Sequence, residues 1–97
     1  MHKEIIRGIA KTIIDGIKDA QMQLDWACTA KKEGEMELAH LHIEEAKKRL
    51  DGVKQWYEYA TAKMGKHHED DAAYEAMEDH YRDWARKIRE RVLEFKV

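Results

Sequence analysis

The chain has 97 residues, of which 39% are charged and 43% are apolar, so it holds no long apolar stretch that could span a membrane. Its 18 basic and 20 acidic residues give a formal net charge of -2, which excludes a general positive field for nucleic acid. The length is typical of a single domain, 1-97, with a core small enough that association between chains would add to its stability.

Glycines divide the chain into three segments, and there is no proline. Gly34 and Gly65 each follow lysines, which is typical of a helix end with cations near the last carbonyls and a glycine in the left-handed conformation. The sequence therefore predicts one helical domain with helices at about 3-33, 35-64 and 69-96. Because short turns favour antiparallel neighbours, the predicted fold is an all-α, up-down-up three-helix antiparallel bundle that dimerisation could complete.

Apolar residues recur every three or four positions in each segment, which is the spacing of a helix that buries one face. In the first segment they are Ile6, Ile9, Ile13, Ile17, Ala20, Leu24 and Ala27. In the second they are Met36, Ala39, Ile43, Ala46, Leu50, Val53, Tyr57, Ala60 and Met64. In the third they are Tyr74, Met77, Tyr81, Trp84, Ile88, Val92 and Phe95. The regular alternation of threes and fours in the second segment favours a left-handed supercoil, as in coiled coils.

Charges in the third segment are ordered, with acidic residues at its start and Arg86, Lys87, Arg89 and Arg91 toward its end. This order complements the helix dipole and needs no partner. The basic run has no interleaved aromatic platform, so nucleic acid is not an expected partner. The run 67-71, His-His-Glu-Asp-Asp, favours a capped helix start over a metal site, because adjacent residues cannot all converge on one ion.

One polar constellation in the second segment has the composition of a metal site. Glu37, His40 and Glu44 stand at i, i+3 and i+7, so they share one flank of the predicted helix. Counting back from Gly34 in an antiparallel pair places Cys28 level with His40, and Asp25 level with Glu44. Carboxylates and an imidazole suit a divalent transition metal such as iron or manganese, and the metal candidates are Asp25, Glu37, His40 and Glu44. The other interpretation is a solvated or salt-bridged helix flank.

The segment Glu37-Leu38-Ala39-His40 is similar to the Glu-x-x-His element of ferritin-like and rubrerythrin-type proteins. The stretch 39-57 also resembles the second helix of the short, encapsulin-associated ferritins. This resemblance implies a helical bundle that binds iron or manganese, with Glu37, His40 and Glu44 as ligands. The chain departs from the family pattern in lacking a second Glu-x-x-His. Its first segment also offers Asp25 or Gln21 where the family has an inward glutamate.

A second set of apolar residues lies off the main stripes, which suggests burial against something outside a three-helix monomer. Aromatic and methionine side chains are favoured at association surfaces. The predicted interface residues are Met22, Trp26, Leu38, Leu41, Trp56 and Tyr59. Met22, Trp26, Leu38 and Leu41 would merge into one patch near Gly34. A wider core or scattered exposed hydrophobes is the alternative interpretation.

Gly16 and Gly52 are each eighteen residues from Gly34, so they would lie at one height in an antiparallel pair. Three explanations remain open for these two glycines: close approach of the helices, contact with another chain, or a bend. An interior glycine costs a helix about 1 kcal/mol relative to alanine.

The functional features of a dedicated enzyme are missing from the sequence. Cys28 is the only cysteine and has no Cys-x-x-Cys partner, and every glycine is isolated, so no phosphate-binding loop is present. The first residues also lack the layout of a signal peptide. We therefore expect a cytoplasmic, non-enzymatic helical interaction module that self-associates or binds a protein partner, in the manner of a small inhibitor. The alternative hypothesis is a ferritin-like metal-binding protein.

Overall fold

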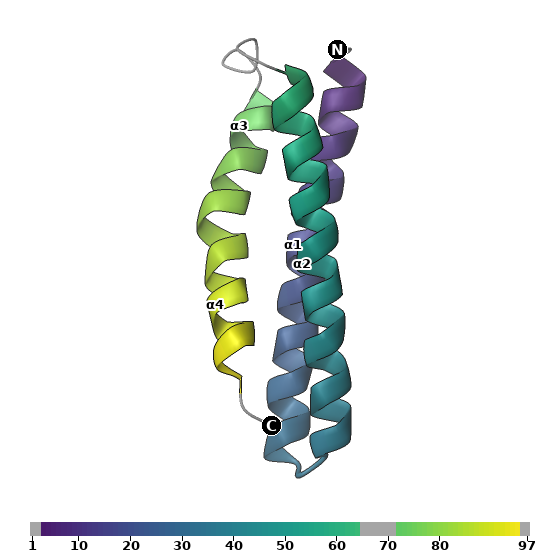
Figure 1. Ribbon diagram of the computed structural model, residues 1–97, viewed down its shortest axis with the longest axis vertical. Coiled ribbons are helices and arrows are strands. Elements are labelled where there is room, and N and C mark those ends of the chain that lie inside the picture. The colour runs from purple at the N-terminus through teal and green to yellow at the C-terminus, as the bar shows by residue number, and fades with distance from the viewer. Residues whose placement is uncertain (1–2, 65–71, 96–97) are drawn as a thin grey trace.

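The computed structural model describes residues 3-64 and 72-95 as an arrangement of helices (Figure 1). Helix α1 spans Lys3–Lys32 and α2 spans Met36–Met64. A third, continuous helix consists of α3 (Ala72–Asp79), the π-helical segment η2 (His80–Ala85) and α4 (Arg86–Glu94). No strand occurs within the described ranges, and the predicted all-α bundle is confirmed. The predictions for Gly65 and for 67-71 fall outside the described residues.

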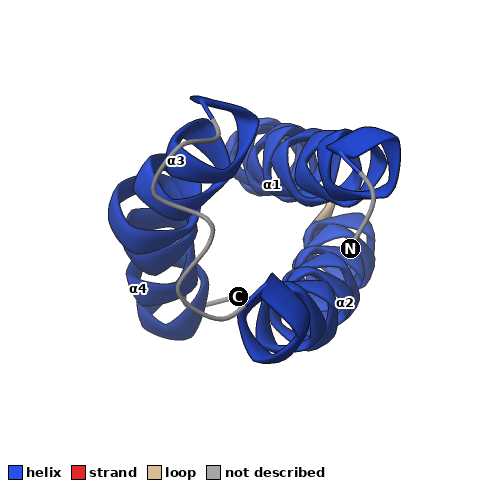
Figure 2. Cartoon of the chain, turned by 90° about the horizontal axis from the view of Figure 1, so that it is seen from above, coloured by secondary structure: helices blue, strands red, loops and turns tan. Residues whose placement is uncertain are grey.

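The three helices lie along one long axis. The chain runs down the molecule in α1, returns in α2 and descends again through α3 and α4 (Figure 1). Seen from above, the third helix lies on one side of the α1–α2 pair (Figure 2). The backbone extends 49 × 18 × 17 Å, so the molecule is a rod whose sides are much larger than its ends.

A glycine ends α1 and turns the chain into α2. Gly34 has a φ of 79°, the left-handed conformation predicted for it. The amide of Gly34 donates to the carbonyl of Lys31 at 3.1 Å, and that of Glu35 donates to Ala30 at 2.9 Å. These two bonds satisfy carbonyls that the end of a helix leaves without partners, and together they form a Schellman motif. The turn therefore sets α1 and α2 side by side over their whole length.

Helix α1 is the centre of the core because it packs along α2 and also contacts α3, η2 and α4, whereas α2 meets the third helix chiefly at α4. All seven stripe residues predicted for it are buried, with Ile13 and Ile17 fully inaccessible. From α2 the core receives Ala39, Ile43, Ala46, Leu50, Val53 and Ala60. The many alanines in this set let the helices approach closely, and no charged or polar side chain is buried among the described residues. Met36 was predicted in this stripe but is exposed, because it lies in the first turn of α2 at the end of the rod.

In the third helix, the prediction that Trp84 belongs to the buried stripe is wrong. Tyr74, Met77, Ile88 and Val92 are buried as predicted, but Trp84 is 40% exposed and Ala85 is buried in its place. The physical reason is the π-helical segment, in which each turn holds more residues than an α-helical turn. The wider turn moves the buried position from residue 84 to residue 85.

Aromatic rings join α2 to the third helix. Tyr57 and Tyr81 stack with ring centroids 3.8 Å apart and an interplanar angle of 5°. Burial raises the pKa of the Tyr57 hydroxyl above its usual 10.0; the charge of Glu78 raises it further, and Arg82 partly opposes the shift. Burial, followed by the charge of Glu78, also raises the pKa of Tyr74.

Within the described residues, no helix is long and apolar enough to cross a membrane.

Candidate functional site

The candidate site is the side of the α1–α2 pair that carries apolar residues outside the core, called the outer face below. Every residue predicted for the interface is exposed: Met22, Trp26, Leu38, Leu41, Trp56 and Tyr59. Trp26 is 47% exposed, Trp56 is 46% and Leu41 is 62%. These side chains are therefore not part of a wider core in the single chain.

One apolar cluster lies toward the Gly34 turn. The rings of Trp26 and His42 meet edge to face with centroids 5.4 Å apart, which joins α1 to α2 across the outer face. Met22 is one turn before Trp26, and Leu38 is one turn before His42, so each follows the same side of its helix. Leu38 and Leu41 also line a shallow hollow beside Gly34. The predicted interface residues near the turn therefore lie exposed on α1 and α2.

A second aromatic cluster lies nearer the other end of α2. Trp56 and Tyr59 meet edge to face with centroids 6.0 Å apart. The ammonium nitrogen of Lys63 lies 5.9 Å from the centre of the Tyr59 ring, within the range of a cation–π contact. This cluster and the one around Trp26 are separated by several turns of α2.

Between the two clusters a groove runs between α1 and α2. Its lining combines charged residues, two glycines and Trp56: Thr12, Asp15, Gly16, Asp19, Lys48, Arg49, Gly52, Val53 and Trp56. Asp15 and Asp19 stand on the α1 side, and Lys48 and Arg49 stand on the α2 side. The groove therefore has one acidic wall and one basic wall.

The two glycines of the groove have different environments. A Cβ atom built on Gly16 would lie 2.6 Å from Cγ2 of Val53, closer than real Cβ contacts allow. A Cβ built on Gly52 would meet nothing within 4 Å. Close approach of α1 and α2 therefore explains Gly16, whereas nothing within the described chain explains Gly52.

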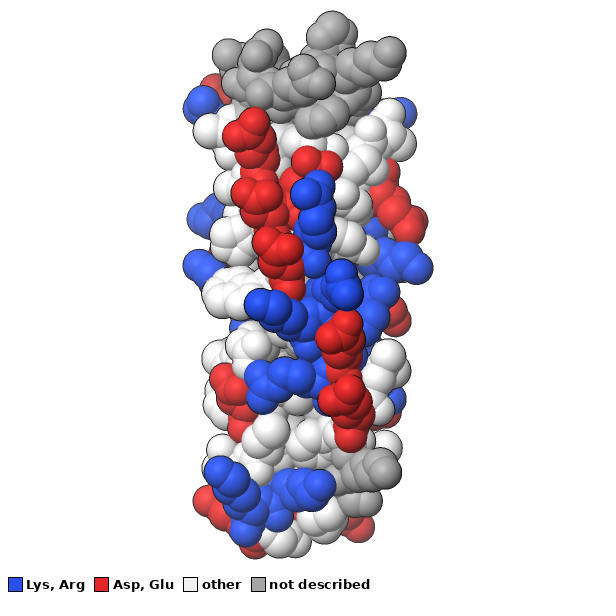
Figure 3. Space-filling model, turned by 90° about the vertical axis from the view of Figure 1, so that its left-hand side faces the viewer, with Lys and Arg blue, Asp and Glu red and all other residues white. Residues whose placement is uncertain are grey.

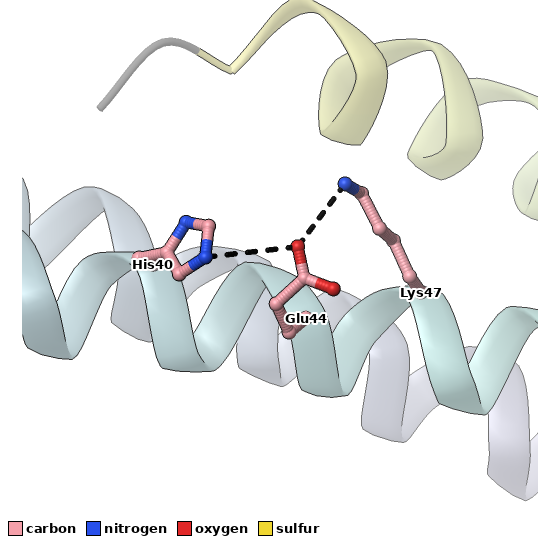
Figure 4. Close-up of polar contacts among 3 residues, drawn as sticks. All are labelled: His40, Glu44 and Lys47. Carbon is pink, nitrogen blue, oxygen red and sulfur yellow. Dashed lines mark hydrogen bonds and ion pairs between the residues drawn. The ribbon is translucent and has the colours of Figure 1, made fainter.

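Of the predicted metal candidates, His40 and Glu44 lie on a solvated flank of α2 beside Lys47 (Figure 4). Nε2 of His40 is 4.0 Å from Oε1 of Glu44, and Nζ of Lys47 is 3.3 Å from the same oxygen. His40 has a side chain that is 61% exposed, and Glu37 is also exposed. On α1, Asp25 accepts a hydrogen bond from Nε2 of Gln21 at 2.8 Å.

The expected cluster of Asp25, Cys28, Glu37, His40 and Glu44 is not assembled. Within residues 3-64 and 72-95, no three His, Cys, Asp or Glu side chains are placed to share a metal ion. The histidine that faces α1 is His42, whose Nδ1 hydrogen-bonds to Oε1 of Gln23 at 2.7 Å. Residues two apart point about 200° apart around a helix, so His40 points away from the α1 contact.

One surface feature of the third helix was not predicted, the contact between His80 and Trp84. Nδ1 of His80 donates to the carbonyl of Ala76 at 2.8 Å, and the His80 ring meets the exposed Trp84 edge to face at 5.4 Å. The only sequence signal for this pair is its i, i+4 spacing. On the face of the third helix, acidic side chains gather in the upper part and basic ones lie below, interrupted by further acidic ones (Figure 3). Arg86, for example, lies 3.3 Å from Glu90.

Comparisons of the chain with protein-family models, with curated proteins and with solved structures find no match.

Proposed function

We propose that the chain is a non-enzymatic helical interaction module of the cytoplasm that self-associates through the outer face of α1 and α2. The observation that supports this proposal is the exposure of Trp26, Trp56 and their apolar neighbours on a helix pair whose core is already filled. Exposed aromatic clusters with a polar surround are typical of association surfaces.

The exposed apolar area is large enough to matter for association. An aromatic side chain offers 150-250 Å² for burial, so a half-exposed tryptophan retains on the order of 100 Å², worth about 2-3 kcal/mol when covered. Bringing two chains together costs at least about 4 kcal/mol. One tryptophan cannot offset this cost, but Trp26 and Trp56 from each of two chains offset it with their neighbours. The proposal is therefore a dimer of moderate affinity.

The size of the face also suits a dimer. A side of the rod measures 49 by 18 Å, which is roughly 900 Å² and close to the ~800 Å² per partner of a standard protein interface.

The test is the molar mass in solution, measured by light scattering over a concentration series. The wild-type chain should shift from monomer to dimer as concentration rises, and Trp26→Glu or Leu41→Glu should keep it monomeric. Leu93→Glu is the matched control, because Leu93 is 72% exposed but belongs to α4. A wild-type chain that stays monomeric throughout the series would contradict self-association.

A further inference from the structure

Among the described residues, nothing neutralises the charged walls of the groove. Asp15, Asp19 and Lys48 form no hydrogen bond or ion pair with another described residue, and Arg49 makes only a 3.9 Å contact with Glu45. The acidic and basic walls thus face outward together, although their charges are opposite and Asp19 is nearly level with Arg49. A surface that carries both signs side by side is complementary to a copy of itself in a suitable orientation.

Two simple twofold arrangements place the outer faces of two copies together. If the twofold axis runs across the rod, α1 lies over the partner's α1 and the copies are antiparallel. An axis near the middle of the face, at the height of Asp19 and Arg49, would then place Asp19 against the partner's Asp19 and Arg49 against the partner's Arg49. Like charges brought together in this way oppose association.

If the twofold axis runs along the rod, the copies are parallel and α1 lies over the partner's α2 at the same height. The contact of Gly16 with Val53 fixes which heights match, and it places Asp19 level with Arg49. The acidic wall of each copy then meets the basic wall of the other. The same operation places Trp26 level with the partner's His42 and about one turn from the partner's Leu38, so charged and apolar residues both find suitable neighbours.

Gly52 fits the same arrangement. It lies in the groove with no described atom near the position of its missing Cβ, yet a glycine inside a helix costs about 1 kcal/mol relative to alanine. The absence of a side chain there leaves the backbone of α2 open to the approach of a second chain.

We infer that two copies of this chain associate in parallel about a twofold axis along the rod, with the acidic wall of each copy (Asp15 and Asp19) facing the partner's basic wall and Asp19 level with the partner's Arg49. This inference rests on the proposed function and adds to it the orientation of the partner. The charges of Asp15, Asp19, Lys48 and Arg49 favour this orientation over the antiparallel one.

Charge reversal tests the orientation. The variant with Asp15→Lys and Asp19→Lys should dimerise at least about tenfold more weakly than the wild type, because both symmetric contacts become repulsive. The variant with Lys48→Glu and Arg49→Glu should be weakened in the same way. An equimolar mixture of the two variants should form mixed dimers about as readily as the wild type forms its own, which native mass spectrometry reports from the different masses.

The matched control carries Asp79→Lys and Asp83→Lys. These are also exposed aspartates spaced i, i+4, but they lie on the third helix, and their reversal changes the net charge by the same amount. The control should dimerise like the wild type, and circular dichroism should show equal helicity in all variants.

The outcomes separate the two proposals. A wild-type chain that stays monomeric overturns the proposed function and the orientation with it. A wild-type dimer that Trp26→Glu dissociates, but that the reversal of Asp15 and Asp19 weakens no more than the control does, overturns the parallel orientation alone. Weak single variants with a restored mixture support both.

Discussion

Replacement of Gly16 by alanine tests how closely α1 and α2 pack. The new Cβ would lie 2.6 Å from Cγ2 of Val53, a buried and β-branched side chain whose rotamer is nearly fixed in a helix. Overpacking of this kind costs about 1-3 kcal/mol, and alanine returns about 1 kcal/mol of helix propensity. We therefore expect Gly16→Ala to destabilise the chain by roughly 1 kcal/mol on balance.

Gly52→Ala is the matched control, since its Cβ meets nothing within 4 Å. It should stabilise the monomer by about 1 kcal/mol, so the two glycine variants should differ by about 2 kcal/mol. For a domain of this size, that difference corresponds to a gap of roughly 8-16 °C in Tm. Both variants should be measured by urea and thermal unfolding at concentrations low enough for the monomer, because dimer formation would add to the apparent stability.

A second substitution checks the cause. In a chain that already carries Val53→Ala, the Cγ2 atom is gone, and Gly16→Ala should become stabilising by about 1 kcal/mol. Equal stabilisation by Gly16→Ala and Gly52→Ala in the wild-type background would refute the close contact. So would a destabilisation by Gly16→Ala that persists without Val53.

Three further predictions concern the turn, the tyrosines and the metal candidates. Gly34→Ala should lower the free energy of unfolding by about 1-2 kcal/mol, measured in urea, because φ is 79° at that position and alanine is strained there; unchanged stability would contradict the role of the turn. The pKa of Tyr57 is raised in the folded chain, so the unfolded chain loses this proton at a lower pH, and the free energy of unfolding should fall as pH rises above 10. Tyr57→Phe should reduce this fall in urea unfolding, and an identical pH profile for the two chains would argue against the buried tyrosine contact. Protein purified without a histidine tag should carry no stoichiometric iron or manganese by elemental analysis, because the ammonium group of Lys47 contacts the same Glu44 oxygen that lies nearest to His40; metal that disappears in His40→Ala would instead support the ferritin-like alternative.

Local chemistry made most of the helical architecture predictable. The three-and-four spacing of isoleucines located the buried side of α1 without knowledge of its neighbours, because the period of the helix fixes which residues share a side. Gly34 was predictable as a turn because few residues other than glycine adopt a positive φ. The exposure of Trp26 and Leu41 followed from the same spacing, since neither lies on a main stripe.

The errors arose where the answer depends on contacts between helices. Trp84 fits an α-helical stripe as well as Ala85 does, and only the π-helical segment decides between them. His40 and His42 both stand on α2 within reach of α1 in height, but the side on which the helices touch determines that His42 meets Gln23. Sequence spacing gives the height of a residue along a pair of helices, and it does not give the rotation of one helix against the other.

The unequal sharing of contacts gives the chain a preferred order of unfolding. Helices α1 and α2 touch along their length and are joined by a short turn, whereas the third helix shares far fewer contacts with either of them. Elements with few contacts open at lower free energy, so backbone amides of α3 and α4 should exchange with deuterated solvent sooner than those of α1 and α2. The outer face belongs entirely to α1 and α2. A chain whose third helix has detached would therefore still present that face.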